Sequence, residues 1–284
     1  MHIADALANT PVSTVDLTRF VEVPADATVA ETVRSMCSAR RSCACIVEDG
    51  RLAGVFTQRD VLLRAIGRPS TWDRPIAEEM TTAVRTITVE QSVSDGLKVM
   101  NDWWVRSVPV VDNGTRLVGN LSYYIVMAAI ADLVRAHAGE SPAEVAVEHG
   151  LTLIDFTGLN TSHPVTVGSE DTADIAAHHM RARAIGSVLV VDEREHLIGV
   201  LSEFDLQMKV GCDQADLSTI QVKDIMTPDP VALAARSSIA SAIQQMADRE
   251  FSHVPLLGES GRLVGIASFR DVAAYFEASL QALS

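Results

Sequence analysis

The stretch GVFTQRDVLL, Gly54 to Leu63, ends an apolar run and opens a segment with the spacing of an amphipathic helix. Within it, Thr57 precedes Asp60 by three residues, which is the spacing of a capping box. In such a box the hydroxyl accepts from a backbone amide of the first turn, and the carboxylate accepts from the backbone of the cap residue. A box of this kind stabilises a helix by about 1 kcal/mol without any ligand. One copy alone would therefore indicate a helix start and nothing more.

The same arrangement occurs in three further places, which are GNLSYYIVMA from Gly119, GVLSEFDLQM from Gly199 and GIASFRDVAA from Gly265. The segments around Gly119 and Gly265 align without a gap, with Met80 on Met226 and Pro109 on Pro255. The other two copies align in the same way apart from one inserted residue in a turn. The chain therefore consists of four repeats, arranged as two similar halves.

Each repeat has the same predicted elements. A short extended run precedes a Thr or Ser and a segment whose apolar residues follow one helix face, and two β-type runs separated by turn residues come next. A second helix starts at the capping motif. The residues predicted to cap the first helix of each repeat are Thr28, Ser92, Thr172 and Ser238. We therefore predict an α+β fold of four β-α-β-β-α units, each of about sixty residues.

The composition is that of a soluble globular protein, since the 284 residues are 48% hydrophobic, 5% aromatic and 21% charged. A chain of this length can bury two ordinary cores without help from metals or disulfides. Its formal net charge of −14 argues against binding to nucleic acid or to an anionic membrane, because both draw on clustered Lys and Arg. We expect neither as a partner.

The cysteines and the N-terminus favour a cytoplasmic location. Cys37, Cys43, Cys45 and Cys212 form no CxxC pair and no metal-ligand spacing with histidine, so we expect reduced, mostly buried thiols and no metal site. The N-terminus lacks the basic and apolar regions of a signal peptide. The most apolar stretch, residues 125–134, has about half the length of a membrane-spanning helix.

Repeat 2 shows that the aspartate of the motif is not needed to start the helix. It keeps Ser122 at the cap but has Ile125 where the other repeats have aspartate, so a helix of the same register forms without the carboxylate. Asp60, Asp205 and Asp271 are therefore free to do more than cap a helix. A short carboxylate beside a helix start suits the two hydroxyls of a ribose, and the adjacent backbone amides suit a phosphate.

At this point the chain resembles the cystathionine β-synthase (CBS) domain family. The resemblance rests on the motif G-h-x-T/S-x-x-D, on the β-α-β-β-α order and on the fourfold repetition. It implies two Bateman modules, each a pair of repeats, in a disc-like assembly similar in layout to the γ subunit of AMP-activated protein kinase. We place the first module at 12–135, with repeats at about 12–70 and 76–135, and a linker at 136–154. The second module is placed at 155–284, with repeats at about 155–212 and 220–280.

The resemblance also implies the ligand and its contacts. Paired CBS repeats bind adenosyl compounds such as AMP, ADP, ATP or S-adenosylmethionine, and no cofactor is required. The aspartate would bind ribose hydroxyls, the Thr or Ser would contact ribose or phosphate, and the first strand with the hairpin would form an apolar slot for adenine. The ribose and phosphate residues are then Thr57, Asp60, Ser202, Asp205, Ser268 and Asp271, and the adenine-slot candidates are Val21, Val165 and Val231.

Phosphate charge must be neutralised locally in so acidic a chain. Arg59 and Arg270 lie inside two of the motifs, and His163 and His253 lie near a first strand and a hairpin, so these four are the candidates. A solvated surface side chain or a helix cap is the alternative for each. Repeat 2 should make no ribose contact of this type, because Ile125 cannot accept from a diol.

The function expected from the sequence is a regulatory adenosyl-ligand sensor that has no catalytic activity of its own and acts on an effector protein not identified by the sequence. A structural or assembly module with vestigial pockets is the alternative, and S-adenosylmethionine is the alternative ligand. A nucleotide-hydrolysing enzyme is a third reading, but the sequence contains no HExxH, GxGxxG or P-loop motif. Both a monomeric disc and a homodimer fit four repeats in one chain.

Overall fold

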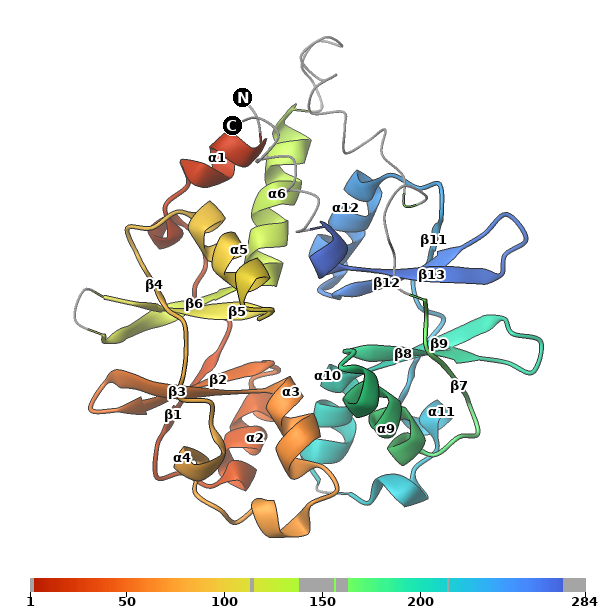
Figure 1. The fold of residues 1–284 in the computed structure, drawn as a ribbon, viewed down its shortest axis with the longest axis horizontal. Coiled ribbons are helices and arrows are strands. Elements are labelled where there is room, and N and C mark those ends of the chain that lie inside the picture. Colours follow the sequence, from red (N-terminus) through yellow and green to blue (C-terminus); the bar gives the residue numbers. More distant parts are fainter. Residues whose placement is uncertain (1–2, 113–114, 138–155, 157–162, 214, 273–284) are drawn as a thin grey trace.

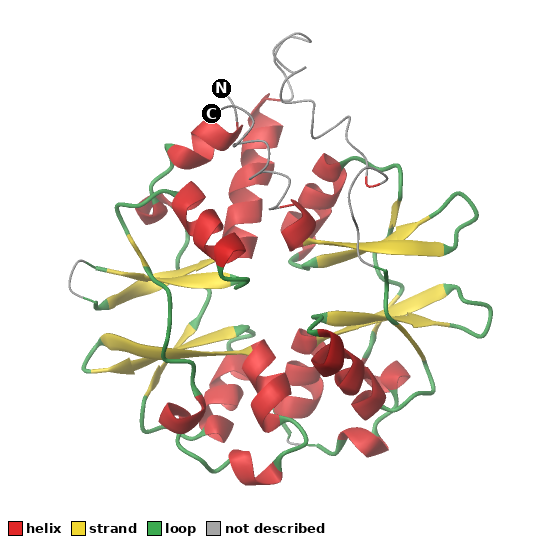
Figure 2. Ribbon diagram, in the orientation of Figure 1, coloured by secondary structure: helices red, strands yellow, loops and turns green. Residues whose placement is uncertain are grey.

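The computed structural model describes residues 3–112, 115–137, 156, 163–213 and 215–272. These residues form a disc in which four small sheets lie in two stacked pairs, with the helices gathered beyond the sheets at two opposite ends (Figure 1, Figure 2). The predicted α+β fold of four repeats, paired into two modules, is confirmed. Most of the predicted linker, 136–154, lies outside the described residues.

The first half contains two repeats with the same order of elements. Repeat 1 follows helix α1 (Ile3–Ala8) and a 3-10 turn (Val12–Thr14), and it contains β1 (Val21–Pro24), α2 (Val29–Ser38), β2 (Cys43–Glu48), β3 (Arg51–Thr57) and α3 (Gln58–Asp60), the last continued by a π-helical turn (Val61–Ala65). A 3-10 turn (Pro69–Thr71) leads to repeat 2, with α4 (Ile76–Glu79), β4 (Ile87–Thr88), α5 (Val93–Asp102), β5 (Ser107–Val111), β6 (Leu117–Ser122) and α6 (Tyr123–His137).

The second half repeats this order. Repeat 3 contains β7 (Thr166–Gly168), α9 (Ala173–Arg183), β8 (Ser187–Val191), β9 (Leu197–Ser202) and α10 (Glu203–Leu206), followed by a π-helical turn (Gln207–Gly211) and a 3-10 turn (Leu217–Thr219). Repeat 4 contains α11 (Val222–Ile225), β10 (Thr227–Pro228), β11 (Leu233–Ala234), α12 (Ile239–Arg249), β12 (His253–Leu257) and β13 (Leu263–Ser268).

Every repeat builds its sheet in the same way. The strand before the first long helix of each repeat (β1, β4, β7 and β11) pairs in parallel with the next strand, which pairs with the one after it as an antiparallel hairpin. The short strand β10 of repeat 4 instead adds to the repeat 3 sheet, antiparallel to β9. A register shift interrupts each hairpin at the same place, between Ile46 and Val47 in repeat 1 and between Val110 and Val111 in repeat 2. Because side chains alternate along a strand, each hairpin turns one face to the helices and the other to the paired sheet.

The helices close the disc by packing between the two halves. One apolar cluster joins repeats 1 and 3, with fully buried Val29, Met36 and Met180 among its members. The second cluster joins repeats 2 and 4, where Leu97 of α5 and Ile243 of α12 are both buried. Sheets thus pair within a module, and helices pair between modules. None of the described helices has the length and apolarity that a bilayer crossing requires.

Three of the four predicted helix caps form as expected. Thr28 and Ser92 make capping boxes with Glu31 and Asp95, and Ser238 accepts from the backbone of its own first turn. Thr172 does not cap α9, so that prediction is wrong. Its hydroxyl donates instead to the carboxylate of Asp174, two residues further on, in a local side-chain hydrogen bond.

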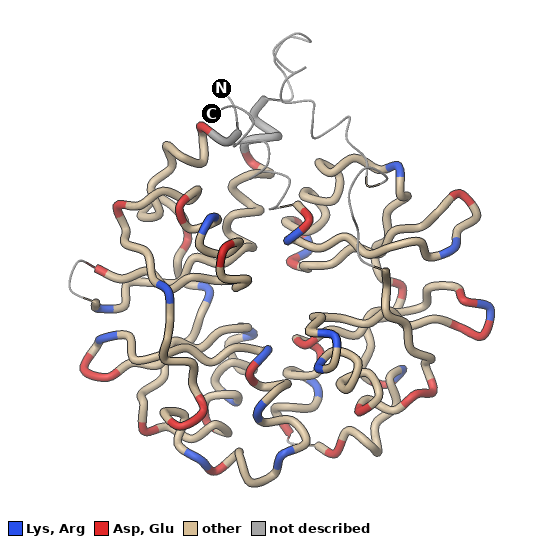
Figure 3. The backbone as a smooth tube through the Cα atoms, viewed as in Figure 1, with Lys and Arg blue, Asp and Glu red and all other residues tan. Residues whose placement is uncertain are grey.

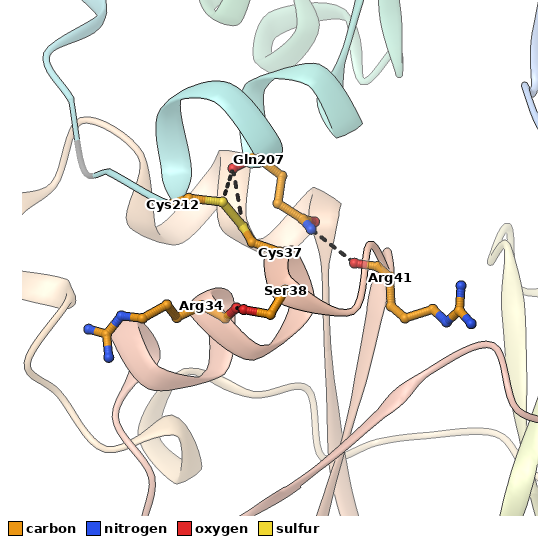
Figure 4. Close-up of a disulfide and its surroundings, with 6 residues drawn as sticks. All are labelled: Arg34, Cys37, Ser38, Arg41, Gln207 and Cys212. Carbon is orange, nitrogen blue, oxygen red and sulfur yellow. Dashed lines mark hydrogen bonds between the residues drawn. A yellow bond between two sulfur atoms is a disulfide. The ribbon is translucent and has the colours of Figure 1, made fainter.

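The structure also corrects the prediction of four reduced cysteines. Cys37, at the end of α2, and Cys212, after the π-helical turn of repeat 3, form a disulfide with their Cα atoms 6.3 Å apart (Figure 4). The two residues are separated by 175 positions, so only the closed packing of repeats 1 and 3 brings them together. Cys43 and Cys45 are free and buried, as predicted.

Candidate functional site

Each aspartate of the motif gives one carboxylate oxygen to its own helix start. The backbone N–H and the hydroxyl of the cap residue both donate to Oδ2. The distances are 2.8 and 2.7 Å for Thr57 to Asp60, 2.9 and 2.6 Å for Ser202 to Asp205, and 2.6 and 2.7 Å for Ser268 to Asp271. Capping therefore uses Oδ2 of each carboxylate and does not involve Oδ1.

The surroundings of Oδ1 distinguish the three aspartates. In Asp60 it lies 3.4 Å from Arg64 Nε. In Asp205 it lies 3.7 Å from Lys209 Nζ and accepts from the hydroxyl of Thr227 at 3.3 Å. Within the described residues, no hydrogen bond or ion pair involves Oδ1 of Asp271. Of the three carboxylates, Asp271 is the one whose second oxygen is available to a ligand.

Asp271 lines a cavity of about 650 Å³, here called cavity 1, between the sheets of repeats 3 and 4 near the middle of the disc. The cavity also includes Ser268 from the same motif and Val165 from the segment that enters β7. All four phosphate candidates reach it, namely Arg59, His163, His253 and Arg270. Cavity 1 thus gathers residues of all four repeats, which are far apart in the sequence.

A second cavity of about 340 Å³, cavity 2, lies between the sheets of repeats 1 and 2. Thr57 lines it together with Ala83 and Val84, which precede β4. The two cavities share Arg59, Arg106 and Arg270, so they adjoin at the middle of the disc.

The apolar wall beside each motif comes from the paired repeat. Val165 of repeat 3 faces the repeat 4 motif in cavity 1, and Val84 of repeat 2 faces Thr57 in cavity 2. Val21 and Val231, the other adenine-slot candidates, line neither of these cavities, and neither do Asp60, Ser202 and Asp205. Roles for these five residues stay predictions.

A cluster of arginines stands where the two cavities meet. Arg59 Nε and Arg106 Nη1 lie 2.6 and 3.0 Å from the two carboxylate oxygens of Glu203, whose side chain is fully buried. Arg270 donates to the backbone carbonyl of Trp104 at 3.0 Å, and its guanidinium lies 4.7 Å from the ring centroid of Trp104. Two guanidinium groups therefore share one buried carboxylate, and a third, that of Arg270, lines the same two cavities. Elsewhere in the chain the acidic residues are spread around the disc (Figure 3).

Burial lowers the pKa of Arg59 and of Arg270, and the neighbouring arginines lower both further, against the opposing effect of Glu203. Crowded and partly desolvated cations of this kind are stabilised by an anion placed among them. The middle of the disc therefore favours a negatively charged ligand.

His253 is a neutral side chain rather than the cation that a phosphate candidate was expected to be. Burial, followed by the fields of Arg106, Arg270 and Arg59, lowers the pKa of His253 to about 3. The imidazole is consequently neutral at physiological pH, with Nδ1 at 2.8 Å from the hydroxyl of Ser252. It can donate one hydrogen bond to a phosphate, but it carries no charge to neutralise it.

Sequence reasoning missed Arg106 and Glu203, which organise the cluster. Arg106 occupies a position where the other repeats have Ser42, Gly186 and Ser252, so a comparison of the repeats at that position could have identified it. Glu203 follows the cap residue Ser202 and resembles an ordinary acidic residue of a helix start. Within the described residues, no group of three or more His, Cys, Asp or Glu side chains could hold a metal ion.

Comparison with known proteins gives a consistent result. The family model described as the CBS domain matches residues 12–67, 76–132, 157–210 and 222–278. A curated relative, the CBS domain-containing protein CBSCBSPB3 of Arabidopsis thaliana, is 24% identical over 86% of this chain. The chain spans about half the length of the curated relatives that it matches over most of its own length, with 41% and 48% of the first two.

Among solved structures, a Methanocaldococcus jannaschii protein proposed as an archaeal homologue of γ-AMPK has a TM-score of 0.77 and 16% identity, and the match covers 92% of this chain and 98% of that one. This similarity shows the fold of the whole disc. A shorter CBS domain protein from Pyrobaculum aerophilum, solved in complex with AMP, is 22% identical, with a TM-score of 0.41, over 46% of this chain and 98% of that one.

Proposed function

Because the chain belongs to the CBS domain family, we propose that it is a regulatory module that binds an adenine nucleotide of the AMP, ADP or ATP type in cavity 1. The observation that carries this proposal is the state of Asp271. One of its oxygens caps the helix start, the other has no partner among the described residues, and the carboxylate lines a cavity beside Arg270. The hydroxyls of a ribose would donate to this second oxygen.

The remaining contacts follow from the positions of the side chains. The ribose binds to Asp271 and Ser268, and the base occupies the slot beside Val165. The phosphate extends toward Arg270 and Arg59 in the middle of the disc, where His253 donates a neutral hydrogen bond. This arrangement puts the anionic end of the ligand where burial has left cations without enough counter-charge.

The charge of the cavity favours a nucleotide over S-adenosylmethionine. Arg59, Arg106, Arg183 and Arg270 all line cavity 1, and Asp271 is its one carboxylate among the described residues. S-adenosylmethionine carries a sulfonium and an ammonium group, and bringing these positive charges near four guanidinium groups is unfavourable. A phosphate gains from the same groups.

The output of the module is proposed to be regulation of a separate effector protein, without catalysis by this chain. Ligand binding can act in this way only if two packings of the repeats differ in their affinity for the nucleotide. We propose a cytoplasmic location and a disc that functions as a monomer or a homodimer. The Cys37–Cys212 disulfide removes cysteine usage as an argument for the location, because such bonds are typical of oxidising compartments.

The proposal is tested by isothermal titration of AMP, ATP and S-adenosylmethionine into the wild-type chain and into Asp271→Asn. We expect the nucleotides to bind, and the variant to lose about tenfold or more in affinity at cavity 1. Asp95→Asn is the matched control, since Asp95 accepts from Ser92 in the same kind of capping box and lines neither cavity. Silence toward all three ligands would favour the assembly reading instead.

A further inference from the structure

Repeat 2 departs from the other repeats at a second position, Asn120 on β6. The residues at the same place in the hairpins of the other repeats are Val55, Val200 and Ile266. Asn120 pairs with Pro109 of β5, and its backbone N–H donates to the carbonyl of Leu17 at 2.9 Å. The backbone at this position is therefore satisfied in the way a valine would allow, and the amide side chain adds nothing to the strand.

The side chain of Asn120 is buried without a partner. It is 1% exposed, and neither Oδ1 nor Nδ2 has a hydrogen bond to any of the described residues. The hydroxyl of Ser122, two residues on and on the same face of the strand, is also unbonded, with its residue 6% exposed. Buried polar groups are normally paired, because burying them without a partner is unfavourable. An apolar residue here would suit the fold better, as the three other repeats show.

Both residues line cavity 2, so a ligand there can reach them. The rest of the lining is suited to a nucleotide. Val55, Ala83 and Val84 offer an apolar surface, and Arg59, Arg85, Arg106 and Arg270 offer positive charge. No Asp or Glu is among the described residues that line cavity 2. Its volume of about 340 Å³ falls within the range of small-molecule sites.

The chemistry of the amide specifies which part of a ligand it meets. An amide presents one donor and one acceptor side by side, and it pairs best with a group that offers an acceptor and a donor at the same spacing, as the edge of adenine does. A phosphate offers acceptors only and would leave Oδ1 unpaired. We propose that Asn120, with Ser122 beside it, is the specificity-determining residue of cavity 2, where it reads the edge of the base of a nucleotide whose phosphate the arginines hold.

This inference rests on the proposed function, because it assumes that the chain binds nucleotides. It assigns to repeat 2, which lacks the ribose aspartate, the task of base recognition for a nucleotide that also contacts Thr57. Asn120 is then the residue that determines base specificity. The equivalent residue of repeat 1 is Val55, which also lines cavity 2 but cannot hydrogen-bond to a base.

The test is isothermal titration of AMP and of ribose 5-phosphate into the full chain carrying Asp271→Asn, in which cavity 1 is weakened so that the tighter binding reports on cavity 2. Adding Asn120→Val should weaken AMP binding by about tenfold or more. The same change should alter the affinity for ribose 5-phosphate, which has no base, by less than about twofold. Val118→Asn, at an exposed position near the start of the same strand and outside the lining of cavity 2, is the control and should leave AMP affinity unchanged.

A thermal melt separates base recognition from a structural role. Without nucleotide, Asn120→Val should melt at a higher temperature than wild type, because it removes an unpaired buried amide. With saturating AMP, its gain in melting temperature should be smaller than that of wild type.

Equal AMP affinity with and without Asn120→Val would overturn the inference. A lower melting temperature of the nucleotide-free variant would also overturn it, because the amide would then be bonded in the fold itself, for example to ordered water. If AMP binds cavity 1 of the wild type but not cavity 2, the inference fails while the proposed function survives. If AMP binds neither cavity, the proposed function fails.

Discussion

The neutral state of His253 predicts a loss of stability in mild acid. Its pKa of about 3 in the folded chain lies below the value of about 6.5 for an unfolded histidine. Between these two values the unfolded chain binds a proton that the folded chain does not, so the free energy of unfolding falls as the pH is lowered through this window. At pH 5 the loss from this one residue is about 2 kcal/mol relative to pH 7.5.

Chemical denaturation of wild type and His253→Gln at pH 7.5 and pH 5 measures this loss. Glutamine keeps a hydrogen-bonding group of similar size and cannot titrate, so the variant should lose about 2 kcal/mol less than wild type between the two pH values. His178→Gln, which changes an exposed histidine of α9, controls for the loss of a histidine as such. If wild type and His253→Gln lose the same stability between pH 7.5 and pH 5, the account of the arginine cluster is wrong.

Three further predictions concern the disulfide, the buried carboxylate and the first aspartate. Reducing the Cys37–Cys212 bond should lower the free energy of unfolding by about 2–4 kcal/mol, and Cys37→Ser should abolish the difference between melts with and without reductant. Glu203→Gln should destabilise the chain by about 3 kcal/mol, because its two arginine partners lose their counter-charge, and inorganic phosphate should restore part of the melting temperature; no change on adding phosphate would contradict an anion site there. Asp60→Asn should weaken AMP binding less than Asp271→Asn does, because Arg64 already faces Asp60 Oδ1, and a larger loss in isothermal titration would contradict this assignment.

The sequence predicts the repeat architecture well because the same local pattern occurs four times. A cap residue, an apolar helix face and a hairpin with turn residues each have a short-range physical cause, so each copy supports the others. Thr172 is the exception among the caps. Its side chain makes no capping hydrogen bond and its hydroxyl donates to Asp174, and this outcome depends on side-chain geometry that spacing does not specify.

The parts of the site that were missed depend on contacts between repeats. The sequence identifies Asp271 and Arg270 from their own motif, but it does not show that Val165 faces them from the paired repeat. Glu203 can be recognised as a partner of the arginines only in the closed disc, which brings Arg59 and Arg106 to its carboxylate. The disulfide has the same origin, in the packing of repeats 1 and 3.

The central claim is that an adenine nucleotide binds in cavity 1 with its ribose on Asp271, and a crystal structure of the chain grown with AMP tests it most directly. We predict electron density for AMP between the sheets of repeats 3 and 4, with a ribose hydroxyl within hydrogen-bonding distance of Asp271 Oδ1 and the phosphate among Arg270, Arg59 and His253. AMP bound away from Asp271, or a cavity 1 without AMP in crystals grown at saturating nucleotide, would contradict the claim.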